Sequence, residues 1–404
     1  MRALATRLKV SPATVAAAYR LLRARGLIAA QGRRGTRVIP RPPARGRTHA
    51  RVVPEHAIDL ATGNPDPELL PPIDTALRTL HVDAVMYDAP PQLPALASFA
   101  SAEFEADGVP ARALTITSGA HDAIERVLRE HLRPGDPVAV EDPCFPALQD
   151  LLAASGYVAV PFAIDQEGPD PSAVTSALRR GCRAIVVTTR AQNPTGAAIS
   201  ETRATDLRAL LRRHADLLLV ESDPCGPIAG APPATLVDAS RHRWAHVKSV
   251  AKFLGPDLRV ALVAGDPLTI GRVEGRHVLG PRRVSYLLQQ LVLALWSDPS
   301  AGRRLARASE IYRQRRSALI DALAAHGLVT HGTSGLNVWV PLRREGHVVQ
   351  ALADRGWLAA AGEPFRIHAD PGIRITIATL LPADAQRLAA DLADLVGPTQ
   401  GPAA

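Results

Sequence analysis

The sequence has 404 residues, of which 47% are hydrophobic and 21% charged, so it is long and apolar enough to bury a large core. This composition excludes a disordered or fibrous chain. The first residues are not followed by an apolar stretch long enough for a signal peptide or a membrane span, so we expect a cytoplasmic protein. Cys144, Cys182 and Cys225 have no CxxC spacing, which argues against a disulfide framework and a zinc site and favours buried free thiols.

The formal charge of +8 is unevenly distributed. Residues 1–51 contain thirteen Lys and Arg and no Asp or Glu, whereas the remainder contains 34 basic and 39 acidic residues. A short basic segment in front of a larger acidic body is typical of an appended nucleic-acid-binding module. A disordered basic arm would have the same composition, so composition leaves both interpretations open.

The amino-terminal pattern predicts two short helices and a hairpin. Leu4, Ala5 and Leu8 share one helical face, and Ser11-Pro12 then provides an N-cap followed by a proline at the first helical position. The second helix is expected to end near Arg25, before a glycine. Residues 27–30 and 36–39 predict two strands joined by a cationic tip over 31–35. The order is that of a helix-turn-helix with a wing.

These residues resemble the winged-helix domain of GntR-type transcription regulators. The resemblance implies a DNA-binding domain over 1–40, a basic linker over 41–57, and a recognition helix at residues 11–25. Members of that family carry a further helix before the point at which this sequence begins. We therefore expect either a start further upstream or a domain that lacks its usual first helix. The residues implied to contact DNA are Ser11, Ala13, Thr14, Arg23, Arg33, Arg34 and Arg37.

Beyond residue 58, short apolar runs alternate with longer amphipathic stretches. This alternation predicts an α/β fold with a largely parallel sheet, whose functional residues should follow the carboxyl ends of the strands. The expected strands are 113–117, 137–140, 184–188, 217–220 and 260–264, and the expected helices include 120–132 and 202–214.

Two of the segments that follow predicted strands have polar, turn-forming sequences. Ser118-Gly119-Ala120 opens a predicted helix, where free backbone N–H groups favour a phosphate, although a plain helix cap has the same sequence. The second, Asn193-Pro194-Thr195-Gly196, could by itself be an ordinary turn.

Lysine is scarce in this chain, since Lys9, Lys248 and Lys252 are the only three among 47 basic residues. An amine is needed where guanidinium cannot serve, and a Schiff base with an aldehyde is such a case. Lys252 is preceded by Ser249 and followed by Arg259, a spacing that supplies a hydroxyl and a guanidinium nearby. A surface charge is the simpler interpretation of either Lys248 or Lys252.

Taken together, these segments resemble the fold type I aminotransferases, which bind pyridoxal 5'-phosphate. With the amino-terminal domain attached, the whole chain resembles the MocR subfamily of GntR regulators. The resemblance implies a fold type I transferase-like domain with a small carboxyl-terminal subdomain over 58–398, followed by a tail over 399–404.

The resemblance also implies a role for individual residues. Lys252 would bind the cofactor aldehyde, and Asn193 its ring hydroxyl. Phe145 would stack on the ring, although core packing is an alternative. Arg374 would clamp a substrate carboxylate, unless it is a surface arginine of a strand. Tyr87 would reach the cofactor phosphate across a symmetric homodimer interface. The phosphate would be held by Ser118, Gly119, Ala120, Ser249 and Arg259.

One departure concerns the ring nitrogen. The family places an aspartate there, whereas in the usual register this position falls on Ser222, and Cys225 replaces a frequent tyrosine. Serine has no charge with which to raise the pKa of the ring nitrogen. A bend near Pro224 could bring Asp223 into contact, although successive side chains of a strand point to opposite faces.

We therefore expect a transcription regulator that senses pyridoxal phosphate, an amino-bearing metabolite or both, with little or no catalytic turnover. An active aminotransferase with a vestigial DNA-binding head is the alternative. A pseudoenzyme without cofactor is a third possibility. The expected partners are operator DNA, a small effector and a second copy of the chain, with no metal and no membrane.

Overall fold

The computed structural model describes residues 2–24, 28–30, 35–38, 57–81, 83–238 and 240–397. Its amino-terminal part contains α1 (Arg2–Leu8), α2 (Pro12–Ala24), β1 (Ile28–Ala30) and β2 (Thr36–Val38).

The expected helices and hairpin are present in this part. The Ser11 hydroxyl accepts a hydrogen bond from the Thr14 backbone N–H at 3.0 Å, which caps the start of α2. β1 and β2 pair antiparallel, with Ile28 opposite Val38. The cationic tip with Arg33 and Arg34, and the linker up to residue 56, lie outside the described residues.

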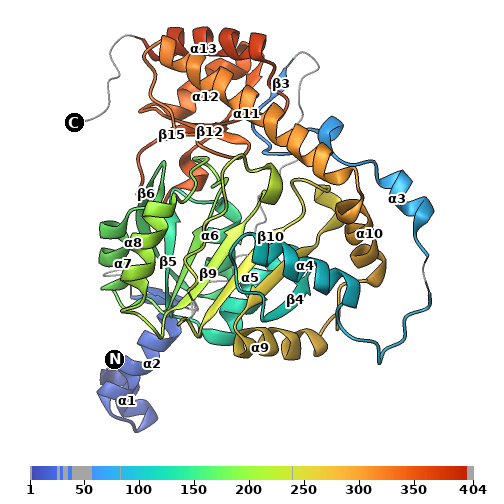
Figure 1. The fold of residues 1–404 in the computed structure, drawn as a ribbon. Coiled ribbons are helices and arrows are strands. Elements are labelled where there is room, and N and C mark those ends of the chain that lie inside the picture. The colour runs from blue at the N-terminus through green and yellow to red at the C-terminus, as the bar shows by residue number, and fades with distance from the viewer. Residues whose placement is uncertain are drawn as a thin grey trace.

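An eight-stranded sheet forms the centre of the large body, in the order β4-β11-β10-β9-β8-β5-β6-β7 (Figure 1). The fold is therefore α/β, as predicted. β11 runs antiparallel to both of its neighbours and β7 antiparallel to β6, while the other pairs are parallel. The strands are β4 (Ala113–Thr117), β5 (Pro137–Asp142), β6 (Val158–Asp165), β7 (Gly168–Pro169), β8 (Ala184–Thr188), β9 (Leu218–Asp223), β10 (Trp244–Ser249) and β11 (Ala261–Gly265).

Helices cover both faces of this sheet, as expected where helices connect parallel strands. On one face, Ile124 of α5 and Val273 of α9 pack against Val220 and Val247. On the other face, helices including α4 and α8 contribute to the larger apolar cluster. The helices of the body are α4 (Pro94–Ala106), α5 (Ala120–His131), α6 (Pro146–Ser155), α7 (Pro171–Leu178), α8 (Glu201–Leu211), α9 (Pro267–Val278) and α10 (Tyr286–Ser297), with short 3-10 turns η3 (Gly226–Ile228) and η4 (Pro256–Leu258).

The small subdomain is built from the carboxyl-terminal residues and from the first segment of the body. β3 (Ile58–Asp59) pairs in parallel with β13 (Trp357–Leu358), so the chain enters the body through this subdomain. Its other elements are α11 (Ala301–Ala325), β12 (Asn337–Pro341), α12 (Glu345–Asp354), β14 (Ala360–Ala361), η5 (Glu363–Phe365), β15 (Gly372–Thr376) and α13 (Pro382–Val396), of which β12, β15 and β14 form a three-stranded sheet. After β3 the chain forms η2 (Pro67–Leu69) and α3 (Ile73–Thr79), and α3 packs against α10 of the body.

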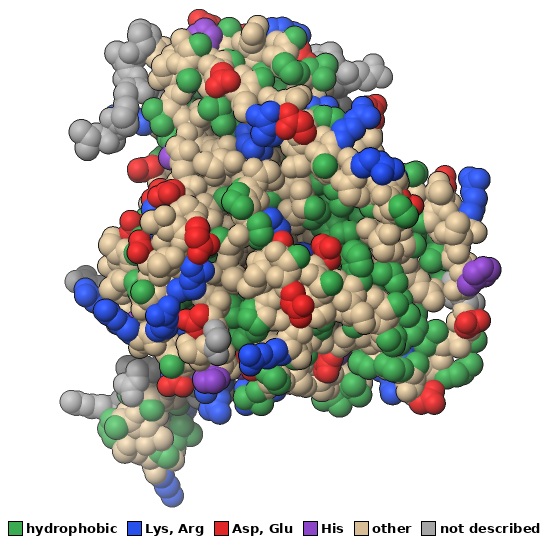
Figure 2. Space-filling view, viewed as in Figure 1, with side chains coloured by type: hydrophobic (Ala, Val, Ile, Leu, Met, Phe, Trp, Pro, Cys, Tyr) green, Lys and Arg blue, Asp and Glu red, His purple; other side chains and the backbone are tan. Residues whose placement is uncertain are grey.

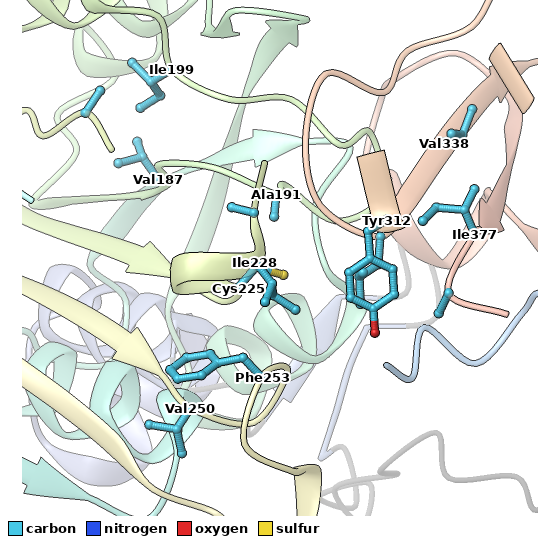
Figure 3. Close-up of a cluster of buried hydrophobic side chains, with 14 of the residues drawn as sticks. Val187, Ala191, Ile199, Cys225, Ile228, Val250, Phe253, Tyr312, Val338 and Ile377 are labelled. Atoms are coloured by element: carbon cyan, nitrogen blue, oxygen red, sulfur yellow. The ribbon is translucent and has the colours of Figure 1, made fainter. Parts of the chain in front are cut away.

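A continuous apolar core joins the sheet to this subdomain (Figure 3). Val187 and Cys225 from the sheet side lie in the same cluster as Val338 and Ile377 of the small subdomain. Tyr312 of α11 also belongs to the cluster, and its hydroxyl accepts a hydrogen bond from the Asp66 N–H at 3.0 Å. The packed apolar core therefore holds the residues at the carboxyl ends of the strands in place.

None of the helices in the described ranges is long and apolar enough to cross a membrane. The three cysteines are free, with Cys144 and Cys225 buried and Cys182 half-buried.

Candidate cofactor site

The predicted phosphate-binding residues meet at the carboxyl ends of β4 and β10. Thr117 and Ser249 both lie opposite Ala261 of β11, which brings the start of α5 next to the turn that follows β10. Gly119 has a φ of +97°, and a Cβ atom there would lie 3.2 Å from Nη2 of Arg259. The guanidinium of Arg259 thus lies against the start of α5, an arrangement suited to an anion, and the Ser118 N–H there donates to Oδ2 of Asp122 at 3.0 Å.

Lys252 lies in the turn after β10 and is half-buried. Its Nζ donates a hydrogen bond to the carbonyl oxygen of Gly63. Burial lowers the pKa of the Lys252 amine, and the positive charge of Arg374 lowers it further. The side chain predicted to bind an aldehyde is therefore more readily neutral than an exposed lysine, as a nucleophilic amine requires.

Arg374 projects from β15 and is buried, with 3% of its surface exposed. Its guanidinium donates to Oδ1 of Asn193 at 3.2 Å and to the carbonyl of Ala61, and it lies 5.0 Å from the ring centroid of Phe365. Its Nε has no hydrogen-bond partner, and within the described ranges no carboxylate forms an ion pair with it. Burial lowers the pKa of Arg374 to about 10.

A buried guanidinium without an anion is costly, because a buried charge is normally compensated by a partner. Arg374 therefore fits the predicted role as the clamp for a carboxylate, and it is not a surface arginine. Asn193 lies within hydrogen-bonding distance of it, so the two predicted residues share one site.

The structure distinguishes Ser222 from Asp223, the two residues that the sequence leaves as alternatives for contact with the ring nitrogen. In register, Ser222 lies opposite Val247 of β10 and Thr188 of β8. Val247 packs with α5, so Ser222 shares the sheet face of α5, at whose start the predicted phosphate-binding residues lie. Ser222 is half-buried between two buried neighbours, as expected for a side chain that borders a binding site.

Asp223 points to the opposite face, and the bend that could have brought it to the ring is not present. Its Oδ2 accepts from Arg190 Nη2 at 2.7 Å and from Nε at 3.0 Å, while Oδ1 accepts from the Gly226 N–H at 2.8 Å. Despite complete burial, these contacts with Arg190 hold the pKa of Asp223 below its usual value. The expectation that Asp223 could contact the cofactor is therefore corrected, because Arg190 engages one oxygen of its carboxylate and the Gly226 N–H engages the other.

Sequence reasoning missed the buried charge network behind the site. Arg190 also bonds Asp107 at 3.0 Å, and Asp107 forms a second ion pair with Lys248 at 2.8 Å. Lys248 is thus a buried structural cation and not a surface charge. No sequence signal predicts this network, since its members are brought together only by the order of the strands.

Phe145 is 40% exposed at the start of α6, so it is not simply core packing. Its ring lies 5.3 Å from that of His121, with the two planes tilted by 32°. Burial lowers the pKa of His121, and the charge of Arg259 adds to this effect. His121 was not predicted, although it follows directly after the Ser118-Gly119-Ala120 segment.

Tyr87 is not brought to the other site residues within this chain. Its side chain is 81% exposed, and Arg282 lies 5.7 Å from its ring. Of the predicted DNA-contacting residues, Ser11, Ala13, Thr14 and Arg37 are exposed, and Arg23 lies in α2.

The residues present fit pyridoxal phosphate. The start of α5 and Arg259 provide an anion cradle that a Cβ at Gly119 would obstruct, and Lys252 provides a desolvated amine. Phe145 provides an exposed aromatic face beside them. The predicted ring-nitrogen position is the one that does not fit, because Ser222 has no carboxylate.

Known proteins share this architecture. The chain matches the aminotransferase class I and II family over residues 58–392. It is 39% identical to the vitamin B6 salvage pathway transcriptional repressor PtsJ of Salmonella typhimurium, over 97% of this chain and 91% of that protein. It is 27% identical to the HTH-type transcriptional regulator YdcR of Escherichia coli, over 89% and 83% of the two chains. Among solved structures, the kynurenine aminotransferase of Pyrococcus horikoshii has a TM-score of 0.76 at 22% identity, covering 84% of this chain and 91% of that one.

The match to class I and II aminotransferases covers most of the chain, and the similarity to PtsJ extends through the amino-terminal residues as well. The chain therefore belongs to the MocR subfamily of GntR transcription regulators, which join a DNA-binding head to an aminotransferase class I and II domain.

Proposed function

We propose that this protein is a transcription regulator that binds pyridoxal phosphate at Lys252 and uses the site for sensing. Bound pyridoxal phosphate supplies an aldehyde and an electron-withdrawing ring. The amine of Lys252 binds the aldehyde, the start of α5 and Arg259 hold the phosphate, and Arg374 orients a carboxylate of an incoming ligand.

The observation that carries the proposal is the pairing of Asp223 with Arg190, which supports Ser222 as the residue that would face the ring nitrogen. Without a carboxylate there, no residue holds a proton on the ring nitrogen, and electron withdrawal is weak. The chain thus keeps the residues for binding and lacks the one for efficient turnover. The name of PtsJ supports a role in controlling vitamin B6 supply, with pyridoxal phosphate itself as the signal.

We also propose that the regulator is a symmetric dimer. The segment before α4 is fixed by Arg283, which donates to the carbonyls of Met86 at 2.5 Å and Ala89 at 2.8 Å. The same segment presents Met86 and Tyr87 with 62% and 81% of their surfaces exposed. An ordered backbone that displays large apolar side chains is suited to a partner. In a dimer, Tyr87 would complete the phosphate site of the partner subunit.

An absorbance titration with pyridoxal phosphate, followed by amino acids and 2-oxo acids, tests the proposal. We expect a band near 420 nm that Lys252→Ala abolishes, a spectral response to amino acids without 2-oxo acid release, and a change in promoter DNA binding. Borohydride trapping should modify Lys252 and leave Lys248 unmodified, because Lys248 is ion-paired with Asp107. Steady product release would instead indicate an active aminotransferase, and no band would indicate a protein without cofactor.

A further inference from the structure

Arginines gather at the edge of the central sheet that lies opposite the cofactor site. The parallel strands begin at this edge, and the helices that precede them end there, because helix and strand run in opposite directions. The arginines in these helix ends and loops, together with Arg272 from the middle of α9, are here called the arginine edge: Arg112, Arg129, Arg133, Arg179, Arg180, Arg183, Arg212, Arg213, Arg241, Arg243 and Arg272.

Few carboxylates offset these charges. Those of the same loops and helix ends are Glu105, Asp107, Glu130, Asp136, Asp216, Asp238 and the buried Asp266, and Asp107 is already ion-paired with Arg190 and Lys248. Asp136 caps the backbone of the Arg133 loop at 2.8 Å, and Asp238 pairs with Arg212 at 2.9 Å. The arginine edge therefore has a net positive charge, whereas the chain beyond position 51 as a whole is net negative, with 34 basic and 39 acidic residues.

Most of these guanidinium groups are available to a partner. Within the described ranges, no salt bridge or side-chain hydrogen bond engages the following exposed arginines: Arg112, Arg129, Arg133, Arg179, Arg180, Arg183 and Arg213. Figure 2 shows Lys and Arg side chains on the surface just below the place where Figure 1 labels α7 and α8.

Helix dipoles explain only part of this clustering. A cation in the last turn stabilises a helix carboxyl terminus, and the effect falls off within that turn. α7 ends at Leu178, yet Arg179, Arg180 and Arg183 all follow it without a carboxylate between them. Three cations within five residues of one loop repel each other, so the loop has more positive charge than its own stability favours.

The arginine edge has the length of a DNA contact. It runs from β4 to β5 across six neighbouring strands, which at about 4.8 Å per strand spans about 24 Å. Duplex DNA presents one negative charge per about 1.7 Å of its axis. A row of arginines of this length can therefore face several phosphates of one duplex at once.

We propose that the arginine edge binds the phosphate backbone of DNA, so that the aminotransferase-like body is itself part of the DNA interface. This inference rests on the proposed regulatory function. The contacts carry no base specificity, which stays with α2, and they add affinity that falls steeply with salt.

The test measures binding of the full-length protein to a mixed-sequence duplex of 60 base pairs over a series of salt concentrations. The variant is Arg179→Gln/Arg180→Gln/Arg213→Gln. The matched control is Arg303→Gln/Arg307→Gln/Arg343→Gln, which removes three exposed arginines of α11 and the loop before α12. We expect the slope of log Kobs against log salt to fall by about 0.9 for each lost phosphate contact in the first variant. The control should keep the slope of the unmodified protein.

Thermal unfolding and the 420 nm band verify that both variants are folded. If both bind DNA with the slope of the unmodified protein, the inference about the arginine edge is overturned while the regulatory function stands. If the unmodified protein binds no duplex at all, both fail. Equal losses in both variants would also overturn it, because they would indicate a general charge effect and not a defined surface.

Discussion

Replacing Ser222 by aspartate is expected to restore the negative charge that this chain lacks at the ring nitrogen. Ser222 is half-buried on the face of β9 shared with α5, and Asp223 is turned away to Arg190. At a hydrogen-bonding distance of about 3 Å and an effective dielectric of about 20, a unit charge and a protonated nitrogen attract by about 5 kcal/mol. Desolvation of the new carboxylate offsets about half, leaving roughly two pKa units on the ring nitrogen.

A ring that holds its proton draws electrons from a bound amino acid more strongly. Two pKa units correspond to about 2.7 kcal/mol, so the conversion of the cofactor from its aldehyde to its amine form could accelerate by up to about 100-fold. The assay is a single-turnover absorbance change after mixing with amino acids, with the 2-oxo acid measured separately. Ser222→Asn is the matched control, since it has the size of aspartate without the charge. Equal rates in the two variants, both with cofactor bound, would refute the reasoning.

Two further predictions concern the pKa of Lys252 and the stability contributed by the ion pair of Arg190 with Asp223. The rate at which Lys252 captures pyridoxal phosphate should rise with pH and level off below the usual lysine pKa of 10.5, since burial lowers its pKa. Arg374→Gln removes a nearby positive charge and should shift that midpoint upward; an unchanged midpoint would contradict this. Arg190→Met should lower the free energy of unfolding by about 3 kcal/mol, because it leaves Asp223 buried and uncompensated. Arg212→Met, which removes the ion pair of an exposed arginine with Asp238, should cost under about 1 kcal/mol in the same denaturant titration, and similar losses would argue against the buried pair.

Much of the fold could be predicted from short-range patterns. The apolar runs at 113–117 and 184–188 coincide with β4 and β8, because strands buried on both faces are continuous apolar stretches. Lys252 stood out because the chain contains only three lysines. Its desolvated setting beside Gly63 is what a reactive amine needs.

Other features depend on which strands are neighbours, and no local pattern contains that information. Arg190 follows β8 and Asp223 ends β9, so their ion pair exists because these strands are adjacent. Lys248 is only four residues from Lys252, yet Lys248 lies in strand β10 and Lys252 lies in the turn that follows it. No local pattern therefore distinguishes Ser222 from Asp223, whereas the sheet register does.

The segment that follows β3, where the chain enters the body, has a consequence for signal transmission. Lys252 and Arg374 both donate to carbonyls of this segment, those of Gly63 and Ala61. A ligand that binds Lys252 and Arg374 must replace the hydrogen bonds of these two side chains to the carbonyls of Gly63 and Ala61. They lie within six residues of position 58, where the chain arrives from the DNA-binding head. Ligand binding at the site and the conformation of the segment that leads to the head are thus linked through two hydrogen bonds. Hydrogen exchange at residues 61–63 would record the loss of these hydrogen bonds.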